Sequence, residues 1–175
     1  TSYTSNLGLE KLRKSISLYV REQFEVDYDP LKEVLVTVGV SEALDLACRA
    51  LLNPGDEVVY HEPCYVSYDP SIALAHGVPV AVSTRPEDNF EVKAEEIEKK
   101  LNSKSKILIL NFPTNPTGAV MTKKELHDIA DLCISRDLIV ITDEIYSELV
   151  YEDDYKHVSI CLLYTSPSPR DSSQS

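Results

Sequence analysis

The sequence predicts an α/β domain built on a mostly parallel sheet. Short apolar runs of strand length alternate along the chain with stretches of helix length, which is the pattern of parallel strands joined by right-handed crossovers. Two of the runs stop abruptly on polar residues, at Asn111 and at Thr142-Asp143. Such an ending is typical of a buried parallel strand that delivers a functional group at its carboxyl end.

The first half of the chain predicts three helices and three strands. Leu9–Phe24 carries apolar residues at helical spacing, and a helix at Ser41–Leu52 is ended by Asn53-Pro54-Gly55. The third helix is expected around Pro70. The full set is helices at Leu9–Phe24, Ser41–Leu52 and Tyr65–His76, and strands at Val34–Val38, Glu57–Tyr60 and Val78–Val82.

The second half predicts two more helices and two more strands. Thr122 and Glu125 have the spacing of a capping box at the start of a helix that runs to Ser135. A charged helix with weak periodicity is expected at Glu91–Leu101. The strands are predicted at Ile107–Leu110 and Ile139–Ile141.

Composition excludes several classes of partner. The formal net charge of −12 argues against nucleic acid and against an anionic membrane surface. No apolar run is long enough to cross a membrane, and the first residues lack an apolar signal core. The four cysteines are scattered without a CxxC pair, so we expect reduced thiols, a cytoplasmic protein and no metal site.

The last residues differ from the rest of the chain. Residues 161–175, CLLYTSPSPRDSSQS, have no periodicity and are rich in Ser and Pro, which predicts a disordered tail. The segment also looks like the translation of a transposase adapter used in sequencing libraries, so we predict a non-native tail. Residues 1–160 are then expected to form part of one domain.

Two strand ends offer candidate ligand contacts by their residue types. Gly39-Val40-Ser41 leads directly into a helix, where free backbone amides and the Ser41 hydroxyl could bind an anion. Ser41 has a structural alternative as the N-cap of that helix. Asn115-Pro116-Thr117-Gly118 is a turn by composition, stiffened by its proline, and stiffness suits an amide held toward a ligand.

Asp143 is more informative, because a carboxylate at the end of a buried strand needs a cationic or hydrogen-bonding partner. No Lys or Arg lies in the segment, and a bound cation would fit. Tyr146 lies three residues on and shares the side of Asp143 in a helical turn. In the alternative interpretation, Asp143 only caps a turn. Tyr65 is either a core residue or an aromatic face for a planar ligand.

Four motifs in register resemble the class I/II aminotransferases, which are pyridoxal-phosphate enzymes of fold type I. They are VTVGVSEAL, NPGDEVVYHEPCYVSY, NFPTNPTGAV and ITDEIYSELVY, and the resemblance extends from Tyr3 to about Ile160. It is closest to the aspartate and aromatic aminotransferase branch. It implies an incomplete three-layer α-β-α domain, the large cofactor-binding domain of that fold.

The resemblance also implies roles for single residues toward pyridoxal 5'-phosphate. Val40 and Ser41 would bind the phosphate, and Tyr65 would stack on the pyridine ring. Asn115, rather than Asn111, would hydrogen-bond the phenolic oxygen of the ring.

Three further roles follow from the same resemblance. Tyr146 would donate to the phenolic oxygen, and Asp143 would pair with the ring nitrogen and keep it protonated. Tyr3 would reach the phosphate in the neighbouring subunit of a homodimer.

The chain departs from the family pattern at the catalytic lysine. No lysine here stands where the family has its Schiff-base lysine, and Lys156 comes too early. The arginine that binds the substrate carboxylate and the small domain are also missing. We therefore expect a fragment that is inactive by itself. Two later strands of the family's sheet would separate Val34–Val38 from its neighbours, so we also expect poor stability.

The leading interpretation is a truncated transaminase that moves an amino group from an L-amino acid to a 2-oxo acid. One alternative is a carbon–sulfur lyase that uses the same pocket. Another is a non-catalytic α/β module that binds a nucleotide or phosphate, and a third is a polypeptide without function.

Overall fold

The computed structural model describes residues 5–149, 151 and 156–163. The chain divides into two compact units, Thr1–Leu46 and Ala47–Ser175. Helix α2 (Gly39–Leu51) crosses the boundary between them.

The first unit holds helix α1 (Glu10–Phe24), which confirms the first predicted helix. The predicted strand at Val34–Val38 is wrong, because these residues form no strand. Instead, the Val36 amide donates to the Leu7 carbonyl at 3.1 Å and Arg13 Nε donates to the Val34 carbonyl at 2.8 Å. β-Branched residues favour a strand only where a neighbouring strand completes the ladder, and none of the described strands pairs with this segment.

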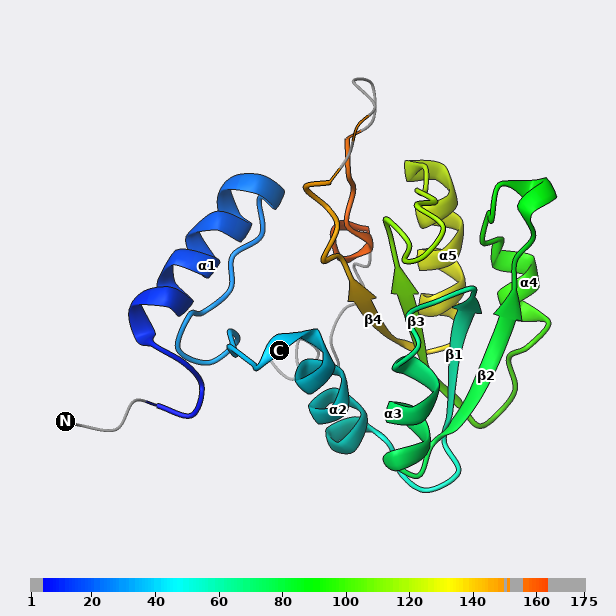
Figure 1. Cartoon of the computed structure of the whole chain (residues 1–175), viewed down its shortest axis with the longest axis horizontal. Helices are drawn as coiled ribbons and strands as arrows, with labels where there is room; N and C mark the ends of the chain where they lie inside the picture. Colours follow the sequence, from blue (N-terminus) through cyan, green and yellow to red (C-terminus); the bar gives the residue numbers. More distant parts are fainter. Residues whose placement is uncertain (1–4, 150, 152–155, 164–175) are drawn as a thin grey trace, which may run out of the picture. The chain divides into compact units, whose positions relative to one another are not determined.

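The second unit contains a four-stranded parallel sheet in the order β2-β1-β3-β4. All four arrows point the same way, so the carboxyl ends share one edge (Figure 1). These strands confirm the four remaining strand predictions, each with one or more additional residues. Their bounds are β1 (Glu57–Glu62), β2 (Val78–Ser83), β3 (Ser105–Asn111) and β4 (Ile139–Asp143).

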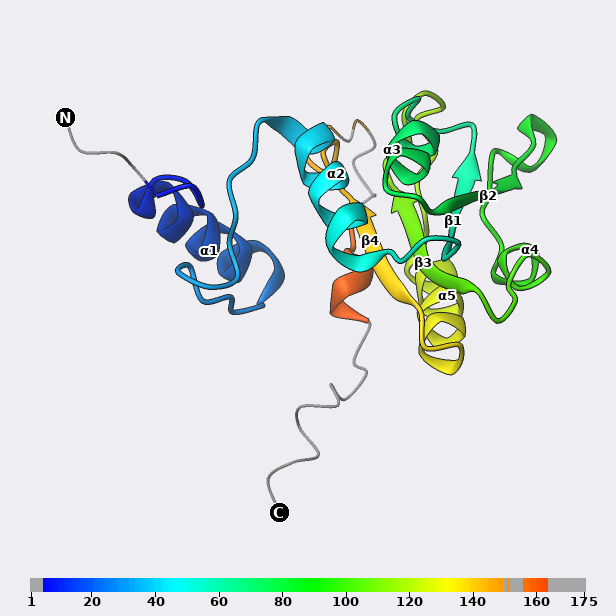
Figure 2. The same ribbon diagram turned by 90° about the horizontal axis from the view of Figure 1, so that it is seen from below.

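Helices cover both faces of the sheet. Helix α3 (Tyr68–Leu74) lies on one side, and α4 (Ala94–Glu98) and α5 (Lys123–Ser135) lie on the other (Figure 2). The unit is therefore the three-layer α/β arrangement that the sequence predicts. A short 3-10 turn, η1 (Pro86–Asp88), precedes α4.

Two helices are shorter than predicted, for physical reasons that differ. Helix α3 begins only at Tyr68, which puts Pro70 in the first turn, where its missing amide costs nothing. Helix α4 keeps a single turn around Ile97, which is 1% exposed and is the one buried residue of that helix, so little packing supports a longer helix. Helix α5 starts with the predicted capping box, in which Glu125 N–H donates to Thr122 Oγ1 at 3.3 Å.

The core of the second unit lies between the sheet and α5. Residues Ile107 to Leu110 of β3 are all at most 1% exposed, as expected for the central strand of a covered parallel sheet. The 3-10 turn η2 (Ile160–Leu162) adds Ile160 to this core. The predicted tail starts inside this turn, and residues 164–175 lie outside the described residues.

In the described part, every helix is too short or too polar to cross a membrane.

Candidate functional site

Side-chain hydrogen bonds within the loop after β3 stabilise its backbone. The Asn111 amide oxygen accepts from the Asn115 backbone N–H at 3.0 Å, and the Thr114 hydroxyl donates to the Asn111 carbonyl at 2.7 Å. The Gly118 N–H then closes the predicted turn on the Thr114 carbonyl at 2.7 Å. A positive φ of 73° at Gly118 explains the glycine, since other residues are strained there. The loop therefore presents Asn115 from a fixed backbone.

Asn115 meets Tyr146 across the gap between two loops. The Asn115 side-chain amide donates to the Tyr146 hydroxyl at 3.2 Å, and both residues are partly buried. Tyr146 stands in the turn that follows β4, where the Leu149 N–H donates to the Tyr146 carbonyl at 2.9 Å. The Asn115 amide and the Tyr146 hydroxyl, which can both donate a hydrogen bond, therefore lie next to each other.

Asp143 ends β4 and finds its partner in Tyr68. The Tyr68 hydroxyl donates to Asp143 Oδ2 at 2.8 Å, and Tyr68 is 1% exposed. Burial and then this hydrogen bond to a carboxylate raise the pKa of Tyr68, so the phenol keeps its proton. The other oxygen of Asp143 accepts a long bond of 3.4 Å from the Ile145 N–H. The capping interpretation of Asp143 therefore holds only weakly, and Oδ1 has room for another donor.

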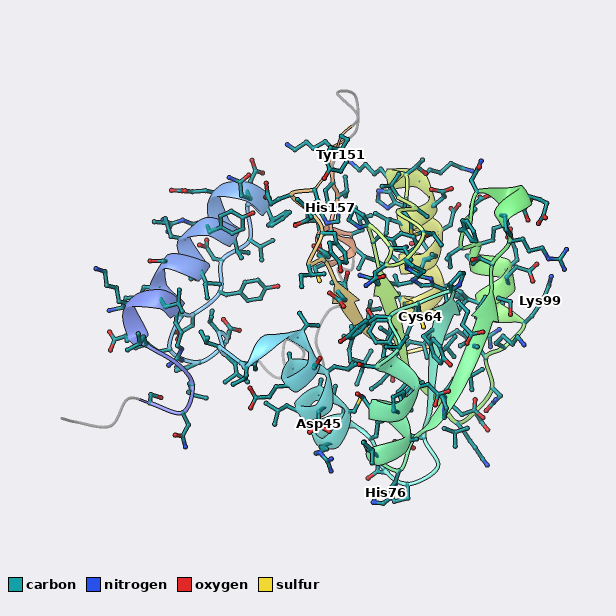
Figure 3. The ribbon with its side chains drawn as sticks, viewed as in Figure 1. Asp45, Cys64, His76, Lys99, Tyr151 and His157 are labelled. Atoms are coloured by element: carbon teal, nitrogen blue, oxygen red, sulfur yellow. The ribbon has the colours of Figure 1, made fainter. Side chains whose placement is uncertain are left out.

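Tyr65 is linked to Asp143 through Tyr68. The rings of Tyr65 and Tyr68 meet edge to face with centroids 5.9 Å apart. Tyr65 is partly buried, which makes it neither a full core residue nor a free surface ring. A cavity of about 590 Å³ opens beside it, at the carboxyl ends of β1 and β2. Its lining includes Tyr60, Cys64, Tyr65, Asp69 and Thr84, of which Cys64 is labelled in Figure 3.

Asn111 connects the two loops, which is a role the sequence did not indicate. Its side-chain amide donates to the Asp143 carbonyl at 2.8 Å, while its oxygen holds the Asn115 amide. Its own backbone N–H donates to His61 Nε2 at 3.3 Å. The His61 ring stacks on Phe112 with centroids 4.9 Å apart. Burial lowers the pKa of His61 from 6.5 to about 4, so the ring is neutral and can accept.

Glu144, in the turn after β4, is bonded to Thr142 and to His157. Glu144 accepts from Thr142 Oγ1 at 2.9 Å and lies 3.0 Å from His157 Nε2. His157 reaches it from the segment that leads to η2 (Figure 3). Burial alone would raise the pKa of Glu144, but hydrogen bonds from His157, Ser159 and Thr142 outweigh it and lower that pKa.

Three predicted site residues are not among the described residues of the second unit. Val40 and Ser41 belong to the first unit, and Tyr3 lies outside the described residues. The N-cap alternative for Ser41 is wrong, because α2 begins two residues earlier, at Gly39. Gly39 has a φ of +76° and no atom near the position of a Cβ, so backbone conformation rather than crowding favours glycine there.

Tyr68, His61 and His157 were missed by sequence reasoning. A signal existed for Tyr68 alone, since it follows Tyr65 by three residues and so shares one side of a helical turn. The partners of His61 and His157 are 50 and 13 residues away in the chain. No local pattern reveals such pairs.

Comparison with known proteins gives the family. The family described as "Aminotransferase class I and II" matches residues 1–169. A putative aminotransferase of Bacillus subtilis is 45% identical over 91% of this chain and 41% of its own length. An aspartate aminotransferase of Pyrococcus abyssi is 44% identical over 93% of this chain and 42% of its own length.

Solved structures agree with the sequence matches. The crystal structure of an aromatic aminotransferase from Pyrococcus horikoshii superposes with a TM-score of 0.89 at 43% identity, and the match covers 93% of this chain and 43% of that one. The chain thus spans about 41% of the length of the first curated relative. With a family match over almost its whole length, the chain belongs to the class I and II aminotransferases.

Proposed function

We propose that this chain forms part of the pyridoxal 5'-phosphate site of an enzyme that transfers an amino group from an L-amino acid to a 2-oxo acid. The observation that carries the proposal is the donor and acceptor set at the carboxyl ends of β3 and β4. Asn115 and Tyr146 place two donors 3.2 Å apart, and Asp143 supplies an acceptor. A hydroxypyridine ring needs donors for its phenolic oxygen and an acceptor for its protonated nitrogen, so the residues fit it.

Each side chain has a defined task in this proposal. Asn115 and Tyr146 donate to the phenolic oxygen, and Tyr65 offers its ring face to the pyridine. Asp143 accepts a hydrogen bond from the protonated ring nitrogen, and its charge keeps the proton on that nitrogen. When bound, the cofactor supplies a ring that accepts the electrons left when a substrate loses its α-proton.

Tyr68 has a supporting task. It donates to Asp143 Oδ2, and its raised pKa keeps that proton on the phenol. This hydrogen bond holds the Asp143 carboxylate in place, with Oδ1 left to receive the ring nitrogen. Val40 and Ser41 are proposed to bind the phosphate, and Tyr3 to reach the phosphate of a neighbouring subunit in a homodimer.

We further propose that the 175-residue chain binds the cofactor without a covalent bond and has no transaminase activity by itself. None of its lysines stands in the motif where the family resemblance places the cofactor-binding lysine. Borohydride treatment of the chain with pyridoxal phosphate should give at most partial labelling spread over several exposed lysines. A single, stoichiometric adduct on one lysine would contradict this part.

Absorbance titration of the chain with pyridoxal phosphate tests the site. Asp143→Asn keeps the size of the side chain and removes its charge, so we expect the affinity to fall about tenfold or more. The matched control is Asp69→Asn, because Asp69 also faces a tyrosine hydroxyl, that of Tyr60, at 3.5 Å. Equal affinities for the wild type and Asp143→Asn would refute the proposed role.

The same titration separates this function from that of a plain phosphate-binding module. Such a module would bind inorganic phosphate and pyridoxal phosphate with similar affinity. The proposal predicts a preference for pyridoxal phosphate that Tyr146→Phe weakens and Tyr60→Phe leaves unchanged.

A further inference from the structure

Asn111 is a buried residue to which the proposed function gives no task. It is 1% exposed, and all four of its polar groups are bonded. Its N–H meets His61, its carbonyl meets Thr114, its amide oxygen meets the Asn115 N–H and its amide nitrogen meets the Asp143 carbonyl. A buried polar network in which every group is satisfied is rigid and specific.

The side chain of Asn111 has two partners, the backbone N–H of Asn115 and the backbone carbonyl of Asp143, and both residues define the candidate site. One side chain thus fixes the distance between the loop that carries Asn115 and the strand end that carries Asp143. The two bonds measure 3.0 and 2.8 Å, and both are partly buried. In contrast, the described structure shows no direct bond between Asn115 and Asp143 themselves.

His61 fixes Asn111 in turn. A neutral imidazole accepts the Asn111 N–H at Nε2, and its ring is held by the stack on Phe112. His61 is 3% exposed, so water does not replace this acceptor. The chain of contacts therefore runs from β1 through β3 to β4 at the edge where the site lies.

We propose that Asn111, held by His61, is the positioning residue that sets Asn115 and Asp143 at their working separation. It touches neither cofactor nor substrate and acts through those two residues. The inference rests on the proposed function for its purpose, but the contacts it names can be tested without any ligand.

Amide hydrogen exchange of the full chain, read by mass spectrometry, is the ligand-free test. Asn111→Ala removes both side-chain bonds, so we expect exchange at least about tenfold faster in segments 112–119 and 144–149, with β1 and β2 unchanged. The control is Asn102→Ala at the other end of β3. Asn102 donates to Glu57 Oε2 at 2.7 Å and accepts from the Lys104 N–H at 2.8 Å, but it is exposed.

A second pair of variants separates positioning from packing. His61→Phe keeps an aromatic ring on Phe112 and removes the acceptor, whereas His61→Gln restores an acceptor near the position of Nε2. We expect faster exchange in segment 112–119 for His61→Phe and a return toward the wild-type rate for His61→Gln. Identical exchange in Asn111→Ala and wild type would overturn the inference, as would acceleration spread evenly over the whole sheet.

Titration with pyridoxal phosphate links the inference to function. Wild type should bind, and Asn111→Ala should bind about tenfold more weakly while Asn102→Ala matches wild type. If wild type fails to bind while the exchange pattern appears, the proposed function falls and the positioning role stands. If wild type and Asn111→Ala bind equally well, the positioning role is wrong and the proposed function stands.

Discussion

The two ends of the sheet differ in the kind of polar contact and in its surroundings, with buried hydrogen bonds at one end and exposed ion pairs at the other. At the carboxyl end, His61, Asn111 and Tyr68 are all at most 3% exposed. At the amino end, the Lys106–Asp56 pair at 2.7 Å and the Arg136–Glu98 pair at 2.6 Å face solvent, with side chains 25–51% exposed. Water screens the second group and cannot reach the first. The difference predicts that polar substitutions will be costly at one end of the sheet and nearly neutral at the other.

The largest expected effect is the acid sensitivity that His61 confers. Its pKa is about 4 when folded and 6.5 in the unfolded chain, so the unfolded state binds its proton first as pH falls. The stabilisation is complete above pH 6.5 and is lost as pH falls toward 4, by roughly 3 kcal/mol. Chemical denaturation at pH 7 and pH 4.5 measures it. His61→Phe should lose much of this pH dependence. An unchanged pH dependence of the free energy of unfolding in this variant would show that other groups cause it.

Two tyrosine–aspartate pairs provide the next comparison. Tyr68→Phe removes a buried donor to a carboxylate and should lower the free energy of unfolding by about 2 kcal/mol. Tyr60→Phe removes a bond of 3.5 Å to exposed Asp69. It should lower the free energy of unfolding by only a few tenths of the loss expected for Tyr68→Phe. Urea titration of both variants gives the two values, and equal losses would show that burial does not separate the pairs.

Glu144→Gln should have a smaller effect, about 1 kcal/mol, because the amide keeps one acceptor for Thr142. The pKa of Glu144 is lowered in the folded chain, so its stabilisation is present above the unfolded pKa of 4.5 and is lost as pH falls through the folded value. Unfolding curves between pH 3 and pH 7 should show less acid loss for the variant. A steeper acid loss would contradict the sign of that shift.

The smallest effect is expected at the amino end. Arg136→Gln removes an exposed ion pair with Glu98 and should change stability by about 0.5 kcal/mol or less. The change should shrink further in 1 M salt, where charges are screened over about 3 Å. A loss as large as that of Tyr68→Phe would remove the distinction between the two ends.

Much of this fold could be predicted from the sequence, because the signals are local. The run Ile107–Leu110 is apolar without interruption, and Thr122 with Glu125 marks the start of α5 without ambiguity. Val34–Val38 has the same β-branched character and still forms no strand. The difference is the neighbouring strand, and a segment's own residues do not reveal whether one is present.

The candidate site was only partly predictable for a related reason. Asn115, Asp143 and Tyr146 stand in motifs whose order along the chain is itself a signal. Tyr68 and His61 act through partners 75 and 50 residues away, so their roles follow from the fold alone. The family resemblance assigns the ring contact to Asn115 rather than to Asn111, and a sequence does not show that one amide supports the other.

The ladder between β3 and β4 places Asn111 directly opposite Asp143. If β4 slipped along β3 by one residue, every side chain on it would move to the other face, and the Asn111 amide would be buried without its carbonyl. A slipped sheet would keep its apolar contacts in part but lose this bond entirely. The bond from Asn111 to the Asp143 carbonyl therefore favours the observed register of β4 against β3 over a register shifted by one residue.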